Sequence, residues 1–81
     1  MTRDDARDAV LRALSDVAPE VDPSTIRPEL DLREQLDIDS MDLLNFVIGI
    51  HEQARVDIPE SDYPLLQSLD DIVDYVVAKA A

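Results

Sequence analysis

Residues 36–59, LDIDSMDLLNFVIGIHEQARVDIP, decide the fold of this chain. In a helix from Ser40 to Ala54, each residue is rotated by about 100° from the one before. This rotation places five apolar residues on one face, which is expected to lie in the core: Leu43, Phe46, Val47, Ile50 and Ala54. Pro59 disfavours helix in the residue before it, so the helix ends near Arg55. A second apolar set lies apart from that face, on the side nearer to Ser40: Met41, Leu44 and Ile48. It is either a binding surface or a second buried face.

Helical periodicity also appears on both sides of this stretch. Thr2, with Asp5 three residues later, predicts the start of a helix from about Arg3 to Val17, with an apolar face of Ala6, Val10, Ala13, Leu14 and Val17. Ser68 and Asp71 give a similar start to a last helix, with a face of Leu69, Ile72, Val73, Val76 and Ala80.

The connections are long and rich in proline. Pro19, Pro23 and Pro28 predict one long loop from Ala18 to about Asp39, with a short turn after Asp22. Five apolar residues are expected to hold this loop to the core: Ile26, Leu30, Leu32, Leu36 and Ile38. Glu60 to Pro64 predicts one short helical turn, and no segment shows sustained period-two alternation. The chain, residues 1–81, is therefore expected to form a single all-α domain, a bundle of three main helices plus one short helix.

Charge and composition limit the kinds of partner and of chemical site that this chain can have. The chain has 19 acidic and 7 basic residues, a net charge of -12, so basic protein surfaces are expected partners and nucleic acid is not. Residues 34–78 hold eleven acids and one base, Arg55. The absence of Cys excludes disulfides, a thiol nucleophile and thiolate metal sites. With no signal peptide and no apolar run of about 20 residues, we expect a cytoplasmic monomer.

Residues able to support catalysis or metal binding are few. His51, the only histidine, lies about three helical turns from Ser40, too far for a nucleophile and base pair within that helix. Residues 37–48 contain several carboxylates but fail the spacing of a calcium loop, which needs Gly where Asp42 stands and Glu where Ile48 stands. We therefore expect neither an enzyme nor a structural metal site.

Ser40 has two interpretations. It can be the N-cap of the helix, its hydroxyl accepting a hydrogen bond from a free backbone N–H. It can also carry an attached group, because the N–H groups and positive dipole end of a helix N-terminus favour a phosphate there.

The motif Asp39-Ser40-Met41-Asp42 resembles the Asp-Ser-Leu attachment motif of acyl carrier proteins. The resemblance runs without gaps from Asp39 to Val76, including Ile58-Pro59-Glu60 and the closing Ile72 to Val76. It implies that a phosphopantetheinyl transferase moves 4′-phosphopantetheine from coenzyme A to Ser40. The thiol of this arm then carries acyl groups as thioesters, so the chain is a carrier and not an enzyme.

The resemblance also implies a surface that acyl-loading and acyl-processing enzymes bind through basic docking surfaces. Its apolar part is the set Met41, Leu44 and Ile48, and its charge comes from Asp39, Asp42, Glu52 and Asp57.

Three positions depart from the family pattern. Asp37 replaces the usual Gly before the attachment site, and Asn45 and His51 replace acidic residues. These departures suggest a specialised carrier for a fatty-acid, lipid or secondary-metabolite pathway, with its own transferase or loading enzyme. Two alternatives remain: a small acidic helical adaptor without a prosthetic group, and an amino-acid carrier of the D-alanyl type.

Gly49, the only glycine, lies inside the predicted helix at a cost of roughly 0.5–1 kcal/mol relative to Ala. Close packing against a neighbouring helix is the expected reason.

Overall fold

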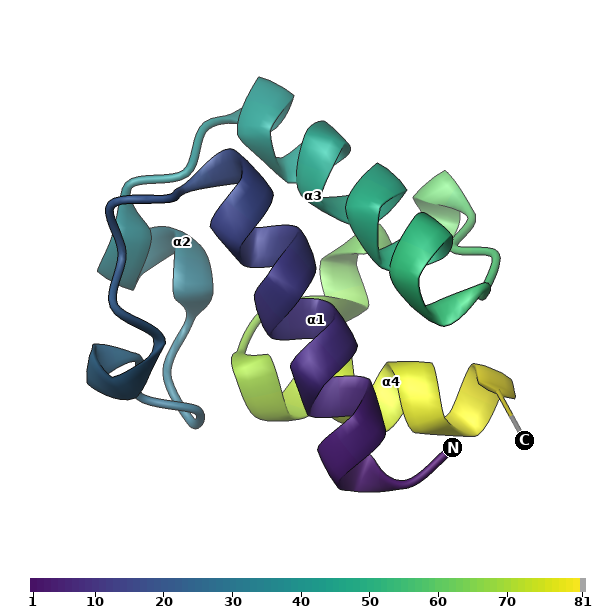
Figure 1. Ribbon diagram of the computed structural model, residues 1–81. Coiled ribbons are helices and arrows are strands. Elements are labelled where there is room, and N and C mark those ends of the chain that lie inside the picture. Colours follow the sequence, from purple (N-terminus) through teal and green to yellow (C-terminus); the bar gives the residue numbers. More distant parts are fainter. Residues whose placement is uncertain (81) are drawn as a thin grey trace.

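The computed structural model describes residues 1–80 and contains six helical elements in this part of the chain (Figure 1). They are α1 (Arg3–Val17), η1 (Pro23–Thr25), α2 (Leu32–Leu36), α3 (Ser40–Ala54), η2 (Glu60–Leu65) and α4 (Leu69–Ala80). α1 packs against both α3 and α4. The all-α bundle is confirmed, and the bounds expected for the first two long helices are those of α1 and α3.

The start of α1 is fixed by its cap and by ion pairs. The Thr2 hydroxyl accepts a hydrogen bond from the Asp5 N–H at 3.1 Å, and the Thr2 N–H donates to the Asp5 carboxylate at 3.4 Å. The Arg3 guanidinium forms ion pairs with Asp70 and Asp74 of α4. The buried face of α1 is the predicted one with Ala9 added, although Val17 is only half-buried: Ala6, Ala9, Val10, Ala13 and Leu14.

α1 and α3 approach each other closely at Gly49. A Cβ atom at this position would lie 3.0 Å from the Cβ of Ala13, inside the usual carbon–carbon contact distance of about 3.5–4.0 Å. The expectation of close packing at Gly49 is confirmed. The glycine lets the two helix backbones approach each other, and Phe46 and Ile50 of the same helix are almost wholly buried.

The connection from Ala18 to Asp39 contains a helix, α2, that the sequence pattern did not predict. The Asp31 carboxylate starts α2 by accepting a hydrogen bond from the Arg33 N–H at 2.8 Å. The Leu32 N–H donates to the Gln67 carbonyl, also at 2.8 Å, and joins α2 to the segment before α4.

Four of the five apolar residues expected to hold this connection do so. Ile26, Leu32 and Ile38 are buried and Leu36 is half-buried. The prediction for Leu30 is wrong, because its side chain is 44% exposed. It follows Arg27 in a turn closed by the Leu30 N–H, which donates to the Arg27 carbonyl, and the turn lies at the surface.

η2 corresponds to the predicted short turn, extended to Leu65. Its Asp62 carboxylate accepts a hydrogen bond from the Tyr75 hydroxyl of α4 at 2.6 Å. Burial, together with this hydrogen bond and the negative charge of Asp62, raises the pKa of Tyr75 to about 12. η2 is therefore held to α4.

α4 begins as predicted. The Ser68 hydroxyl accepts a hydrogen bond from the Asp71 N–H at 3.1 Å. The expected core face is buried through Val76, whereas Ala80, expected in that face, is exposed one turn later at the end of the helix. No helix within residues 1–80 is long and apolar enough to cross a membrane.

Candidate functional site

Ser40 is the first residue of α3, but it does not cap the helix. The Asp39 carboxylate does so, accepting a hydrogen bond from the Asp42 N–H at 2.8 Å. The interpretation of Ser40 as the N-cap is therefore wrong. Its side chain is exposed, and no hydrogen bond to its hydroxyl is formed within residues 1–80. The hydroxyl is free to react at a helix N-terminus.

The segment before Ser40 is held in place by its neighbours. Asp37 ends α2 with φ 52° and ψ 45°, the left-handed conformation in which glycine is least strained. The next residue, Ile38, is buried, and its carbonyl accepts a hydrogen bond from the Arg33 Nε–H at 3.4 Å. A glycine at position 37 would adopt this backbone conformation with less strain than Asp37, and Ser40 lies two residues after the anchored Ile38.

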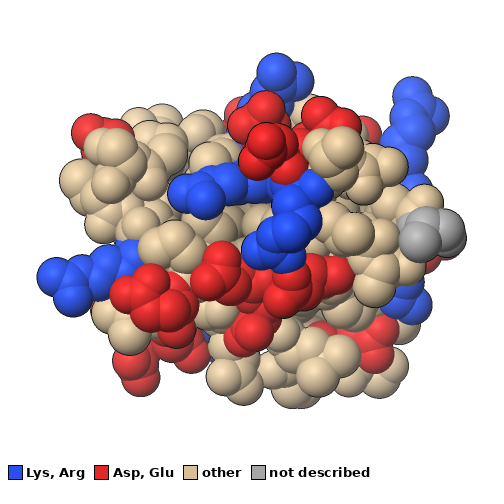
Figure 2. All heavy atoms as spheres, turned by 90° about the horizontal axis from the view of Figure 1, so that it is seen from below, with Lys and Arg blue, Asp and Glu red and all other residues tan. Residues whose placement is uncertain are grey.

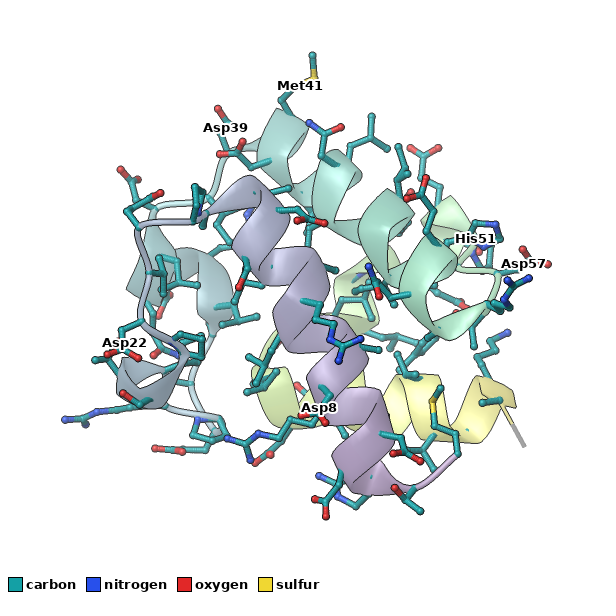
Figure 3. All side chains as sticks on the ribbon, in the orientation of Figure 1. Asp8, Asp22, Asp39, Met41, His51 and Asp57 are labelled. Carbon is teal, nitrogen blue, oxygen red and sulfur yellow. The ribbon has the colours of Figure 1, made fainter. Side chains whose placement is uncertain are left out.

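The second apolar set of α3 lies at the surface. The side chains of Met41, Leu44 and Ile48 are 68%, 44% and 46% exposed. Met41 projects away from the body of the protein, close to Asp39 (Figure 3). The alternative that α3 is buried on two sides is therefore wrong, because one apolar stripe faces outward beside Ser40.

Acidic residues lie at both ends of this stripe. Asp39 is exposed and Asp42 half-buried near Ser40, and Glu52 and Asp57 are exposed near the end of α3. On the face seen from below, which carries the beginning of α1, Lys and Arg side chains lie among the acidic ones (Figure 2). In its sequence, α1 contains both Arg and Asp residues, whereas α3 has no Lys or Arg of its own.

His51 and Asp57 form a contact at the far end of α3 (Figure 3). The His51 Nδ1 lies 3.3 Å from the Asp57 carboxylate and 2.9 Å from the Val56 carbonyl. His51 and Ser40 are eleven residues apart, roughly 16 Å along the helix axis. The structure therefore does not bring them together as base and nucleophile.

Two hollows lie between α3 and the segment that contains η2. The hollow nearer to Ser40, the near hollow, has a volume of about 410 Å³ and is lined by Ser40, Leu43, Leu44, Glu60 and Tyr63. The far hollow, of about 520 Å³, is lined by Val47, Ile48, His51, Asp57, Ile58, Pro59, Tyr63 and Lys79. Tyr63 contributes to both.

The sequence pattern missed Glu60, Tyr63 and Lys79 as residues of the site. The only signal for Tyr63 was an aromatic residue among the polar neighbours of a short turn. Within residues 1–80, no three or more His, Asp or Glu residues cluster closely enough to hold a metal ion.

Comparisons with known proteins agree with this geometry. A family model described as a phosphopantetheine attachment site matches residues 8–76. The chain is 36% identical over 73 residues to an acyl carrier protein of Campylobacter concisus, covering 90% of this chain and 88% of that protein. The chain belongs to the acyl carrier protein family.

Relatives from other bacteria show the same likeness. The acyl carrier protein of Rubrobacter xylanophilus is 30% identical over 74 residues, covering 88% of this chain and 91% of that protein. That of Thermosynechococcus vestitus is 31% identical over 61 residues, covering 75% of each chain. Similarity to acyl carrier proteins thus extends across nearly the whole domain.

Membership of this family implies a covalently attached 4′-phosphopantetheine, and acyl carrier proteins are carriers rather than catalysts. The residues around Ser40 fit such a group. The hydroxyl is exposed, and the N–H groups of Ser40 and Met41, in the first turn of α3, have no preceding helical turn to bond. A phosphate on Ser40 would therefore lie close to these N–H donors.

Proposed function

We propose that this chain is a discrete acyl carrier protein in which Ser40 bears the 4′-phosphopantetheine arm. The observation that carries the proposal is the cap of α3. Because Asp39 satisfies the helix N–H group, the Ser40 hydroxyl is exposed and unused at the N-terminus of α3. The arm, when bound, supplies the thiol that holds an acyl group as a thioester. The chain supplies attachment, presentation and recognition.

Intact mass after incubation with coenzyme A and a broad-specificity phosphopantetheinyl transferase tests the attachment site. One phosphopantetheine is expected on the unmodified wild-type chain and none on Ser40→Ala. Ser61→Ala is the matched control, because Ser61 is also an exposed serine at the start of a helical turn, and it should be modified like the wild type. A mass gain that persists in Ser40→Ala, or no gain in the wild type with any transferase, would contradict the proposal and favour the adaptor without a prosthetic group.

The partner surface of the carrier is proposed to be the exposed stripe Met41, Leu44 and Ile48 with the flanking charges Asp39, Asp42, Glu52 and Asp57. The exposure of the stripe supports this, since an apolar surface beside the attachment site is suited to a protein partner. The carboxylates attract basic docking surfaces, whose association should slow as salt is added. The proposed partners are the transferase and the acyl-loading and acyl-processing enzymes, and we propose a cytoplasmic monomer.

Leu44→Ala tests the surface. Since Leu44 is partly in solvent, its loss should change the free energy of unfolding by about 0.5 kcal/mol or less, whereas the rate of modification of Ser40 should fall about tenfold. Leu30→Ala is a matched control, because both leucines are 44% exposed and Leu30 lies outside the stripe. A large loss of thermal stability in Leu44→Ala with unchanged transfer kinetics would overturn the docking role.

Asp37, Asn45 and His51 support a specialised carrier, in a fatty-acid, lipid or secondary-metabolite pathway, over the general carrier of fatty acid synthesis. Asp37, which has a left-handed backbone, adds a carboxylate three residues before Ser40. This carboxylate alters the surface that a transferase meets. Elongation by general fatty-acid synthase enzymes should therefore be slow on this chain. If these enzymes elongate acyl groups on this chain as fast as on their own carrier, the proposal of a specialised carrier is wrong. Loading by an amino-acid ligase in place of an acyl-loading enzyme would identify the amino-acid carrier.

A further inference from the structure

The near and far hollows lie one after the other along α3, and together they are called the groove. The groove runs along α3 from Ser40 to His51, a separation of eleven residues or roughly 16 Å. Tyr63 of η2 lines both hollows, and it is the one residue that they share. The two hollows therefore meet at Tyr63.

The groove exists because α3 and η2 are held by different neighbours. α3 packs tightly on α1 at Gly49, where a Cβ would lie only 3.0 Å from that of Ala13. η2 is fastened to α4 by the Tyr75 hydroxyl, which donates to Asp62 at 2.6 Å. Neither contact joins α3 directly to η2. The space between them is therefore only partly filled by side chains, and the two hollows remain.

Tyr63 is well suited to divide this space. It is half-buried and lies between Pro59 and Pro64, whose fixed φ angles limit the backbone of η2. Within residues 1–80 its hydroxyl forms no hydrogen bond, unlike that of Tyr75. The ring is therefore held by the position of η2 and by packing.

The two hollows differ at their outer ends. The near hollow begins at Ser40 and combines the apolar side chains of Leu43 and Leu44 with one carboxylate, that of Glu60. The far hollow combines Val47, Ile48 and Ile58 with the ionisable side chains of His51, Asp57 and Lys79. Lys79 is also within 3.9 Å of the Asp62 carboxylate. An alkyl chain that reached the far end would have to pass Tyr63 and meet these polar groups.

We propose that Tyr63 limits the length of acyl chain that this protein shelters, and this inference rests on the function proposed above. The occupant is the acyl group on the arm of the same chain, because Ser40 itself lines the near hollow and the arm keeps the acyl group at high local concentration there. Short acyl groups fit within the near hollow. The remainder of a long acyl chain stays outside the groove, because Tyr63 closes the way to the far hollow.

Holo-protein carrying butanoyl, octanoyl or dodecanoyl groups tests the inference, after intact mass has shown that Ser40 bears the arm. The first measurement uses the wild type alone. The methyl resonances of Leu43 and Leu44, in the near hollow, should shift with each acyl group, whereas those of Val47 and Ile58, in the far hollow, should be the same for octanoyl and dodecanoyl. Shifts of the far-hollow methyls on lengthening to dodecanoyl would overturn the proposal without any variant.

The second measurement is cleavage of the thioester by hydroxylamine. In Tyr63→Ala, protection should increase about tenfold from octanoyl to dodecanoyl, the change that burial of roughly two more methylene groups corresponds to; in the wild type it should not increase. Tyr63→Phe keeps the ring and should behave like the wild type. Leu65→Ala is the matched control, because Leu65 is 57% exposed on the same η2 and lines neither hollow.

Thermal unfolding of each apo variant shows whether the fold is retained, and Tyr63→Leu replaces Tyr63→Ala if the smaller side chain unfolds the protein. Identical dependence on chain length in the wild type and the folded variant would overturn the role of Tyr63. Such a result would leave the mass gain at Ser40, and hence the carrier function, intact.

Discussion

The two sides of α3 are packed in opposite ways. Toward α1, Gly49 brings the helices so close that even a Cβ would crowd Ala13, and Phe46 and Ile50 are almost wholly buried. Toward η2, the same helix leaves two hollows of about 410 and 520 Å³. The comparison shows how a domain of 81 residues can be tightly packed on one side of a helix and keep space beside Ser40 on the other. One interface supplies stability, and the other is left open.

The largest expected effect is on the packed side. Phe46→Ala removes a side chain that is 1% exposed and should reduce the free energy of unfolding by about 3–5 kcal/mol, because a cavity remains in the core. Denaturant titration of the apo-protein measures it. Leu44→Ala, two residues away on the open side, should change stability by about 0.5 kcal/mol or less. Equal losses in the two variants would contradict the contrast between the two sides.

Gly49→Val breaks the close approach itself. Its branched side chain meets Ala13 at the contact between α1 and α3, and overpacking of this kind costs about 1–3 kcal/mol. Thermal and denaturant unfolding give the loss. The second-site change Ala13→Gly should restore part of it by removing the opposing Cβ, a coupling that a double-mutant cycle measures. No recovery in the double variant would show that the contact with Ala13 is not the cause.

The packed side was largely predictable from sequence, because helical periodicity is a local property. The buried faces of α1, α3 and α4 follow from the spacing of apolar residues. The close packing at Gly49 follows from the presence of a glycine inside a helical pattern. The sequence pattern did not predict α2, because a helix of five residues is too short to show helical periodicity. It depends on the Asp31 cap and on the hydrogen bond between Leu32 and Gln67, residues far apart in the sequence.

The candidate site was predictable only in part. Ser40 and the outward stripe of α3 came from the motif and the periodicity, but both Asp39 and Ser40 are good N-cap residues, and only the three-dimensional structure shows that Asp39 is used. The groove and Tyr63 depend on how η2 is placed beside α3. η2 is held by the contact of Tyr75 with Asp62, two residues 13 positions apart, and no local pattern encodes that contact.

Tyr75→Phe removes the hydrogen bond that holds η2 to α4 and so should affect only the open side of α3. Loss of the hydrogen bond to the Asp62 carboxylate should reduce stability by about 1–2 kcal/mol at neutral pH. The pKa of Tyr75 is raised from 10.0 to about 12, so this stabilisation is present in full below pH 10 and is lost as the pH rises toward 12.

The difference in unfolding free energy between wild type and Tyr75→Phe, measured from pH 7 to pH 12, should therefore shrink above pH 10. Tyr63→Phe is the control, since the Tyr63 hydroxyl has no such partner within residues 1–80. A difference that stays constant to pH 12 would contradict a role for the Tyr75 hydroxyl in holding η2.

The smallest expected effect concerns the approach to Ser40, where the open side begins. Asp37→Gly removes the left-handed strain at φ 52° and a negative charge near Asp39, but it also gives the unfolded chain more freedom. The net gain in stability should be about 0.5 kcal/mol, and Asp37→Ala should lose a similar amount, because alanine lacks the local hydrogen bonding that helps Asp to tolerate this backbone.

Arg55→Gly separates the backbone effect of Asp37→Gly from an effect on the transferase. Arg55 has almost the same conformation, φ 56°, but lies at the other end of α3. Both glycine variants should raise the midpoint of unfolding, whereas only Asp37→Gly should change the rate at which a transferase modifies Ser40. If Arg55→Gly changes that rate equally, the carboxylate at position 37 does not influence recognition, and Asp37 affects only the stability of the turn that precedes Ser40.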